Sequence, residues 1–166
     1  MTTARNSNKA IDDLTSNDVS KEFLTIIVGG QMFGIPVLQV QDVLGEKGIT
    51  RIPLAPPEIA GAMNLRGRIV TAIDLRYKLS MPKREDNAET MYIVVEHENE
   101  LYSFIVDKVG DVLSLPESAF EKTLSTIDPA WRDLTSGIYR LKGQLLVILD
   151  VPVVLGGYFN KEDSVA

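Results

Sequence analysis

The sequence contains no cysteine and a single histidine among its 166 residues. Without cysteine the chain has no disulfide, no nucleophilic thiol and no thiolate ligand for a metal. One histidine cannot build the clustered nitrogen sites that zinc prefers, and a serine–histidine–acid triad would have to use that same residue. His97 lies in the charged stretch E-H-E-N-E, where we expect an exposed turn. The sequence therefore predicts a protein that is not an enzyme and holds neither a metal nor a cofactor.

Positive charge is also scarce. Lysine and arginine total 17 against 23 aspartate and glutamate residues, which gives a net charge of −6. No dense basic run is present, so the chain lacks the electrostatic signature of a nucleic-acid-binding protein. No stretch approaches the roughly 20 apolar residues of a membrane span, and the N-terminal region contains no apolar signal segment. We expect a soluble, cytoplasmic protein without nucleic-acid partners or direct membrane insertion.

What the chain does contain is an internal repeat. Residues 31–44 align without a gap on residues 100–113, and residues 61–79 align on residues 137–155. The second copy carries a seven-residue insertion between the two blocks. Each copy is about 70 residues long, a size at which a hydrophobic core alone provides little stability. We therefore expect two similar subdomains that pack on each other and fold as one body.

Both copies show the pattern of short strands joined by tight turns. Hairpins are expected over residues 23–36 and 61–75, with counterparts in the second copy. The turns of the second pair of hairpins contain Gly67 and Gly143, because a tight hairpin needs a residue at positive φ. Five short strands in about 70 residues favour a small, strongly bent barrel, because closure removes exposed sheet edges.

Shorter elements connect these hairpins. Residues 37–44 fit one helical turn followed by a strand, and residues 49–52 fit a brief strand. Residues 81–89 form a polar connector between the copies, which we expect to be solvated. Asp74 and Asp150 each precede a short apolar segment, where an aspartate is a good helix N-cap.

Two features allow a second interpretation. Asp74 and Asp150 occupy equivalent places in the copies, so they could also form the carboxylate pair of a small hydrolase, although capping is the simpler account. Trp131 follows Asp128 and Pro129, a signal for the start of a short helix. This tryptophan fits packing in the core or between subdomains, and alternatively an interface with a partner.

The expected organisation is one ordered domain over residues 21–158. A first barrel spans about residues 21–82 and a second about residues 88–158, and strand exchange between them is possible. Residues 1–20 are expected to form a disordered tail and residues 159–166 a frayed end.

Three blocks of the sequence resemble the CheW family of chemotaxis coupling proteins. They are F-L-x-I-x-V-G-G-x-x-F-G-I-P-V-x-x-V-Q-D-V from Phe23, T-R-I-P-x-x-P-x-x-I-x-G-x-x-N-L-R-G from Thr50, and V-D-x-V-x-D-V-L-S-L from Val106. One block alone is a weak signal, but three in this order and at this spacing are specific. The resemblance implies an all-β fold of two five-stranded SH3-like barrels packed around a common hydrophobic core, with short helices.

The resemblance also implies a non-enzymatic adaptor. Such proteins bind the cytoplasmic tips of methyl-accepting chemotaxis receptors and the regulatory domain of the histidine kinase CheA, and they are recruited to membrane-associated receptor arrays. The motifs leave one alternative open, a related adaptor for another output such as twitching motility or an alternative chemosensory array.

Receptor-binding residues follow from the same resemblance. Arg66 matches the arginine of N-L-R-G, and Asp42 keeps the charge of a position that is usually glutamate. Asn64 lies just before Arg66, where polar side chains beside a rigid glycine turn are well placed to meet a partner.

Apolar positions of the receptor-binding groove are implied as well. Val40 and Val43 match residues that face the groove between the barrels. Leu44 stands where an arginine is common in the family, which indicates a different subset of receptors. The resemblance assigns no kinase-binding residue.

Overall fold

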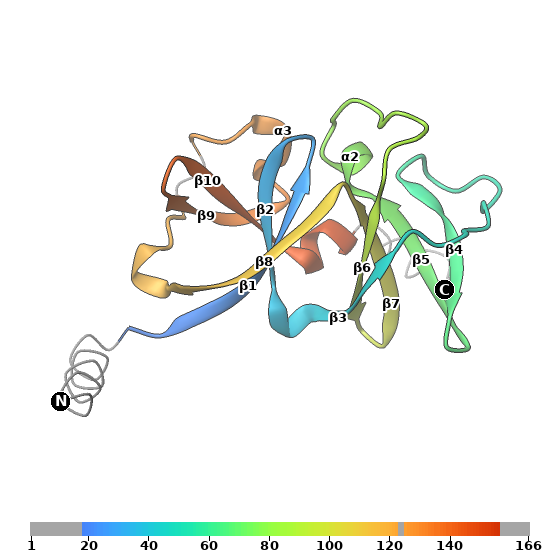
Figure 1. Ribbon diagram of the computed structural model, residues 1–166, viewed down its shortest axis with the longest axis horizontal. Coiled ribbons are helices and arrows are strands. Elements are labelled where there is room, and N and C mark those ends of the chain that lie inside the picture. The colour runs from blue at the N-terminus through green and yellow to red at the C-terminus, as the bar shows by residue number, and fades with distance from the viewer. Residues whose placement is uncertain (1–17, 123–124, 157–166) are drawn as a thin grey trace.

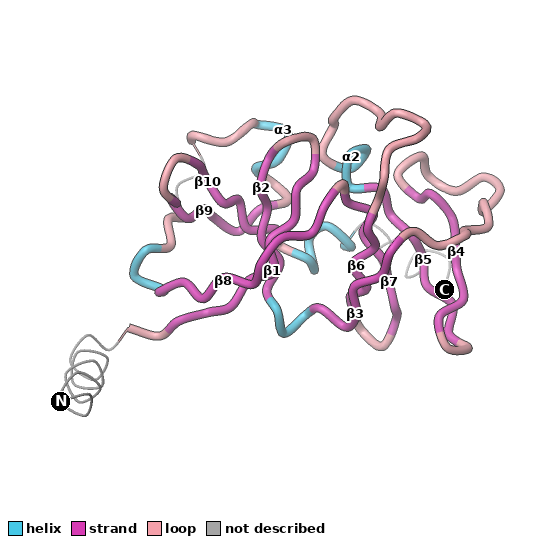
Figure 2. The backbone as a smooth tube through the Cα atoms, viewed as in Figure 1, coloured by secondary structure: helices cyan, strands magenta, loops and turns pink. Residues whose placement is uncertain are grey.

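The computed structural model describes residues 18–122 and 125–156, which form ten strands and a few short helices. The strands build two five-stranded sheets, which lie next to each other in Figures 1 and 2. The all-β class with two five-stranded units and short helices is therefore confirmed.

The two sheets have related strand orders. Sheet A has the order β8-β1-β2-β10-β9 and sheet B the order β3-β6-β7-β5-β4. Neighbouring strands are antiparallel except β2 with β10 and β5 with β7, which are parallel. The strands of sheet A are β1 (Ser20–Val28), β2 (Gln31–Pro36), β8 (Lys108–Pro116), β9 (Thr135–Leu141) and β10 (Gln144–Leu149). Those of sheet B are β3 (Val40–Gly45), β4 (Ile59–Leu65), β5 (Arg68–Asp74), β6 (Met91–His97) and β7 (Glu100–Val106).

The sheets do not follow the two copies of the repeat. In each copy the first two strands enter one sheet and the last three enter the other, so β1 and β2 join β8, β9 and β10. The chain crosses between the sheets at η1 (Val37–Gln39) and again at Asp107, which lies between β7 and β8. A boundary at about residues 82–88 therefore does not separate the sheets. Each copy alone is too small to bury the apolar faces of its strands, and mixing the copies buries both.

A large apolar core lies between the sheets and is built by both. Ile26 and Phe33 of sheet A meet Ile93 and Phe104 of sheet B in one cluster, and all four are inaccessible to solvent. Side chains from the two helical segments that follow β5 and β10 join this cluster: Leu75, Leu79, Val151, Val154 and Leu155.

Each sheet also curls around a smaller core of its own. The members of these two cores occupy equivalent positions in the repeat. Phe23, Tyr139 and Leu146 in sheet A correspond to Tyr92, Met63 and Val70 in sheet B. The repeat therefore encodes the interior of each barrel, and the larger core arises where the barrels meet.

The segment around residue 50 differs from expectation. Residues 37–44 do form one helical turn, η1, followed by β3. The brief strand expected over residues 49–52 is wrong, because only Thr50 pairs with Ala62, through two backbone hydrogen bonds of 2.8 Å. Pro53 has no amide to continue the pairing, and Leu54 at φ 64° turns the chain away.

The expected helix caps are confirmed. The Asp74 carboxylate accepts a hydrogen bond of 3.0 Å from the amide of Arg76 at the start of α2 (Leu75–Lys78). Asp128 caps α3 (Pro129–Arg132) in the same way. Asp150 accepts from the amide of Val153 in the helical segment 151–156. These contacts account for the repeated aspartates without a catalytic carboxylate pair.

Trp131 is half-buried and packs against the shared core, as the first of its two interpretations predicted. Its ring lies edge-on to Phe33 at a centroid distance of 5.3 Å. Its indole nitrogen donates a 2.8 Å hydrogen bond to the carbonyl of Leu79, just after α2. The insertion of the second copy is thereby fastened to the first copy.

The chain is ordered slightly earlier than expected. β1 begins at Ser20, and the Asp18 carboxylate accepts hydrogen bonds from the amide and hydroxyl of Ser118. Of the tail expected over residues 1–20, residues 1–17 lie outside the described residues, as does the frayed end expected over residues 159–166. His97 is the last residue of β6 and is half-buried, so it does not lie in the turn itself.

The connector between the copies is not simply solvated, because Arg84 turns inward from it. The Arg84 side chain is only 10% exposed, and it bonds Asp107 through Nε at 2.8 Å and Asp74 through Nη1 at 2.9 Å. Arg76 donates to the same Asp107 carboxylate at 2.7 and 3.1 Å. We call these four residues the charge cluster. The arginine was missed because its acidic partners are distant in sequence.

Asp107 is the centre of the charge cluster. Burial alone would raise the pKa of its carboxyl, but hydrogen bonds from Arg76, the amide of Gly29 and Arg84 outweigh burial and hold the pKa at about 2. The ordinary pKa of this group is 3.8. Because the folded value is the lower one, the carboxylate stabilises the fold above pH 4 by on the order of 2 kcal/mol, and this contribution is lost as the pH falls toward 2.

Gly61 and Gly137 occupy equivalent repeat positions, and at each of them another segment of the chain, which we call the covering segment, passes close to the glycine backbone. A Cβ at Gly61 would lie 2.4 Å from the carbonyl oxygen of Thr50, and one at Gly137 would lie 2.5 Å from that of Glu121. Thr50 and Glu121 each pair with an outer strand, β4 and β9 respectively. The glycines therefore allow both edge strands to be covered, which removes exposed pairing sites.

We expect Gly137→Ala to lower the free energy of unfolding by about 1–3 kcal/mol, because the covering segment must be displaced. Gly61→Ala should behave alike. Gly48→Ala is the control, since a Cβ there meets nothing within 4 Å. Urea denaturation of the three variants gives the comparison, and equal midpoints for all of them would contradict the steric argument.

We expect Asp107→Asn to destabilise the protein by about 2–3 kcal/mol at pH 7, because two partly buried arginines lose their carboxylate. The variant should also show a flatter dependence of stability on pH between about 4 and 2 than the natural chain. Denaturant midpoints measured across this range test both points. Asp111→Asn, at an exposed aspartate of β8, is the control. An unchanged pH dependence in Asp107→Asn would count against the assignment.

Candidate functional site

The candidate receptor-binding site begins at the tip of the β4–β5 hairpin. Arg66 and Gly67 form its turn at φ 52° and 83°, and the Asn64 side chain accepts a 3.0 Å hydrogen bond from the Gly67 amide. In the second copy Gly143 has the same φ of 83° in the β9–β10 turn. The turn glycines therefore have the conformation that the sequence predicted. A non-glycine residue at positive φ is uncommon, so the conformation of Arg66 is an unusual feature of the first copy.

Asp42 and Arg66 meet although their strands are the two edges of sheet B. Their side chains form an ion pair with an Nη2–Oδ2 distance of 3.0 Å. This contact means that the sheet curls until β3 approaches the β4–β5 hairpin. The Arg66 side chain is 76% exposed and that of Asp42 is 25% exposed. Such a surface pair adds little to stability but presents both charges at a defined place.

The apolar residues of β3 divide between surface and interior. Val43 is 37% exposed and faces outward. Val40 and Leu44 are half-buried, and they pack against the shared core and the core of sheet B respectively. A bulge between Val40 and Asp42 interrupts the regular alternation of inward-facing and outward-facing side chains along β3. Of the three apolar positions, Val43 is therefore the one classed as exposed.

Two further exposed apolar residues were not predicted, one in the β4–β5 hairpin and one on β8 of sheet A. Ile69 is 71% exposed on β5, opposite Asn64 in the hairpin register. Val112 is 50% exposed on β8 and is the repeat equivalent of Val43. Strand alternation around the buried Val70 would have placed Ile69 outside, and the repeat alignment would have paired the two valines.

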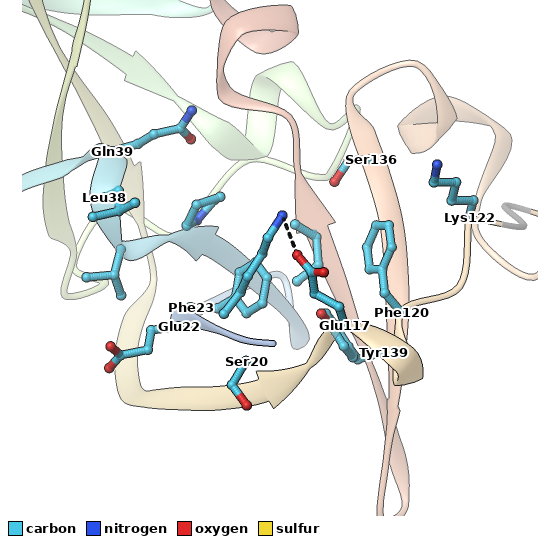
Figure 3. Close-up of a pocket in the computed structure, with 14 residues that line it drawn as sticks. Ser20, Glu22, Phe23, Leu38, Gln39, Glu117, Phe120, Lys122, Ser136 and Tyr139 are labelled. Atoms are coloured by element: carbon cyan, nitrogen blue, oxygen red, sulfur yellow. Dashed lines mark ion pairs between the residues drawn. The ribbon is translucent and has the colours of Figure 1, made fainter. Parts of the chain in front are cut away.

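A separate cavity of about 890 Å³ opens at the end of sheet A (Figure 3). Phe23 and Tyr139 form part of its lining, and the lining residues Lys21 and Glu117 form an ion pair of 3.2 Å. Burial raises the pKa of the Tyr139 phenol, and the carboxylate of Glu117 adds to the effect. None of the six predicted receptor-binding residues lines this cavity.

The arrangement offers binding surfaces and little reactive chemistry. Within residues 18–122 and 125–156, no group of three or more metal-ligating side chains is close enough to hold an ion. Over the same ranges, no helix has the length and apolar character needed to cross a membrane. The distinctive features are therefore an exposed turn, an oriented ion pair and outward apolar side chains.

Comparison with known proteins agrees with this picture. The family model of the CheW-like domain matches residues 22–157. The chain is 33% identical to the chemotaxis protein CheW of Klebsiella aerogenes over 151 residues, covering 87% of each protein. It is 28% identical to the chemotaxis protein CheW of Helicobacter pylori, covering 84% of each.

A solved structure supports the same relationship. The scaffolding protein TtCheW of Thermoanaerobacter tengcongensis superposes with a TM-score of 0.73 at 27% identity, covering 82% of this chain and 88% of the other. The double SH3-like barrel implied by the sequence motifs is confirmed by this match. Since the family model spans most of the chain, the protein belongs to the CheW family of chemotaxis coupling proteins.

Proposed function

We propose that this chain is a non-enzymatic adaptor that couples methyl-accepting chemotaxis receptors to a CheA-type histidine kinase. The observation that carries the proposal is the match to the CheW-like domain over residues 22–157. The relatives are named as chemotaxis proteins, and the solved relative is named as a scaffolding protein. The protein reaches the membrane through the receptors of the array rather than by its own insertion.

The receptor tip contacts the face formed by β3 and the β4–β5 hairpin. Asp42 and Arg66 present opposite charges 3.0 Å apart, with Asn64 beside them and Val43 exposed on the same strand as Asp42. An exposed apolar side chain edged by charges suits the helical tip of a receptor, because the charges orient a helix whose apolar side provides contact area. Val40 and Leu44 support this face from beneath by anchoring β3 in the two cores.

Weak contacts suffice for this function. An adaptor in an array is held by several partners at once, so each single interface can be modest and the assembly still stable. The regulatory domain of the kinase binds at the ends of the barrels, away from the ion pair.

We expect Arg66→Ala to reduce receptor-dependent kinase activation about tenfold, because one charge-assisted contact is lost. Asp42→Arg should have a similar effect. The melting temperature should stay nearly constant, since the Arg66 side chain is 76% exposed. Reconstituted receptor, kinase and adaptor give the activity, and Lys142→Ala, at the equivalent turn of the second copy, is the matched control. Normal activation by both site variants would place the receptor elsewhere.

A charge exchange separates binding from folding. The double variant Asp42→Arg with Arg66→Asp restores an internal ion pair with opposite polarity. If the receptor reads the charges, the double variant remains as defective as either single variant. If the pair serves only to close sheet B, activation recovers, and the receptor-binding role of these residues is wrong.

The partners themselves can be identified by affinity capture from lysate followed by mass spectrometry. The proposal predicts recovery of a CheA-type kinase together with methyl-accepting receptors. Recovery of a kinase and receptors from a motility or sensory system other than chemotaxis would instead support the alternative adaptor.

A further inference from the structure

The two places where the chain crosses between the sheets are fixed very differently. At the first crossing, η1 carries Leu38, which is 96% exposed. At the second crossing, Asp107 occupies the equivalent repeat position, and its side chain is only 16% exposed. The residue at the first crossing is therefore exposed to solvent, whereas the equivalent residue at the second crossing is mostly buried and held by ion pairs.

The second crossing is tied to both sheets at once. The Asp107 amide donates to the carbonyl of Ile27 at 3.0 Å, and its carboxylate accepts from the Gly29 amide at 2.8 Å, both in sheet A or its β1–β2 turn. The same carboxylate binds Arg76 in α2, the helix that follows β5 of sheet B. Asp107 is thus one place where the sheets are joined by hydrogen bonds as well as by apolar contact.

Arg84 adds the connector to this junction. It bridges Asp107 and Asp74 with one planar guanidinium, so the cluster contains two cations and two anions and is electrically balanced. Because the guanidinium is planar and rigid, one hydrogen bond to each of two carboxylates restricts the angle between these groups as well as their distance. The guanidinium comes from outside the strands, so its removal breaks no pairing within either sheet.

The elements that carry the charge cluster and the tip of the β4–β5 hairpin lie at opposite edges of the molecule in Figure 1. In Figure 1 the connector, α2 and the β1–β2 turn are together at the top, whereas the tip of the β4–β5 hairpin and the start of β3 point downward. The sheets are therefore held by ionic contacts at one end, and the proposed receptor contact lies toward the other. A small change of angle at the tied end becomes a displacement at the far end.

We propose that Arg84 is a positioning residue that holds the two sheets at the mutual orientation that shapes the groove between the barrels, which the positions matched by Val40 and Val43 are expected to face. This inference rests on the proposed adaptor function for its consequence, and on the geometry of the charge cluster for its cause. Arg84 is not proposed to contact the receptor. It acts by binding the connector to Asp74 and to Asp107 at the second crossing. Without it, the sheets keep their shared core but sample a wider range of angles.

The angle between the sheets can be measured directly, because the chain has no natural cysteine. Glu100→Cys in sheet B and Lys142→Cys at the β9–β10 turn of sheet A are exposed positions for a pair of spin labels. We expect a broader distance distribution by pulsed electron resonance when Arg84→Met is added. Arg84→Lys, which can reach only one carboxylate, should be intermediate, and Lys83→Met, at the exposed neighbouring residue, should leave the distribution unchanged.

The functional consequence is tested on the same variants without labels. Arg84→Met should bind a receptor cytoplasmic fragment about fivefold more weakly, within the range of coupling through a packed network. Lys83→Met should bind as the natural chain does. An unchanged distance distribution in Arg84→Met overturns the inference, as does a broadened distribution with unaltered receptor affinity. If the natural chain itself fails to bind the receptor fragment, the proposed function fails, while the distance measurement still decides whether Arg84 orients the sheets.

Discussion

The structure depends on one constraint, that neither copy of the repeat can bury its own apolar surface. A unit of about 70 residues has too little interior to be stable alone. The chain meets this constraint by giving each sheet strands from both copies and by placing the largest core between the sheets. Every other feature follows from that arrangement: two crossings, two helical segments that close the shared core, and a junction at which partners can bind.

The charge cluster shows how polar groups complete an apolar junction. The shared core resists separation of the sheets, but apolar contact is non-directional and does not by itself define an angle. Arg76 and Arg84 converge on one carboxylate with hydrogen bonds of 2.7 to 3.1 Å, and such bonds are directional. The core thus provides the stability of the junction, and the cluster provides its geometry.

The sequence was sufficient for local structure and insufficient for the pairing of distant segments. Alternation and turn glycines predicted the hairpins, and the aspartates predicted the caps, because these features depend on neighbouring residues. The exchange of strands could not be read in the same way, since periodicity shows that Phe33 is buried but does not name Val147 as its strand partner.

The candidate site was predictable to the same degree. Its residues followed from the resemblance of their motifs, but the ion pair between Asp42 and Arg66 depends on the curling of sheet B, which no local pattern reports. Arg84 looked like one more charge in a polar connector. Its burial could not be predicted locally, because its partner Asp107 follows it in the sequence only after β6 and β7.

The exchange of strands also governs how the chain can be made. Sheet A begins with β1 and β2, yet β2 must wait for β10, where Phe33 pairs with Val147 near the other end of the described chain. During synthesis the first hairpin therefore emerges from the ribosome long before its partner strands exist, and its apolar face stays open in the meantime. A fold of such non-local pairing forms slowly for its size, and it offers no point at which a truncated chain would fold as an independent half.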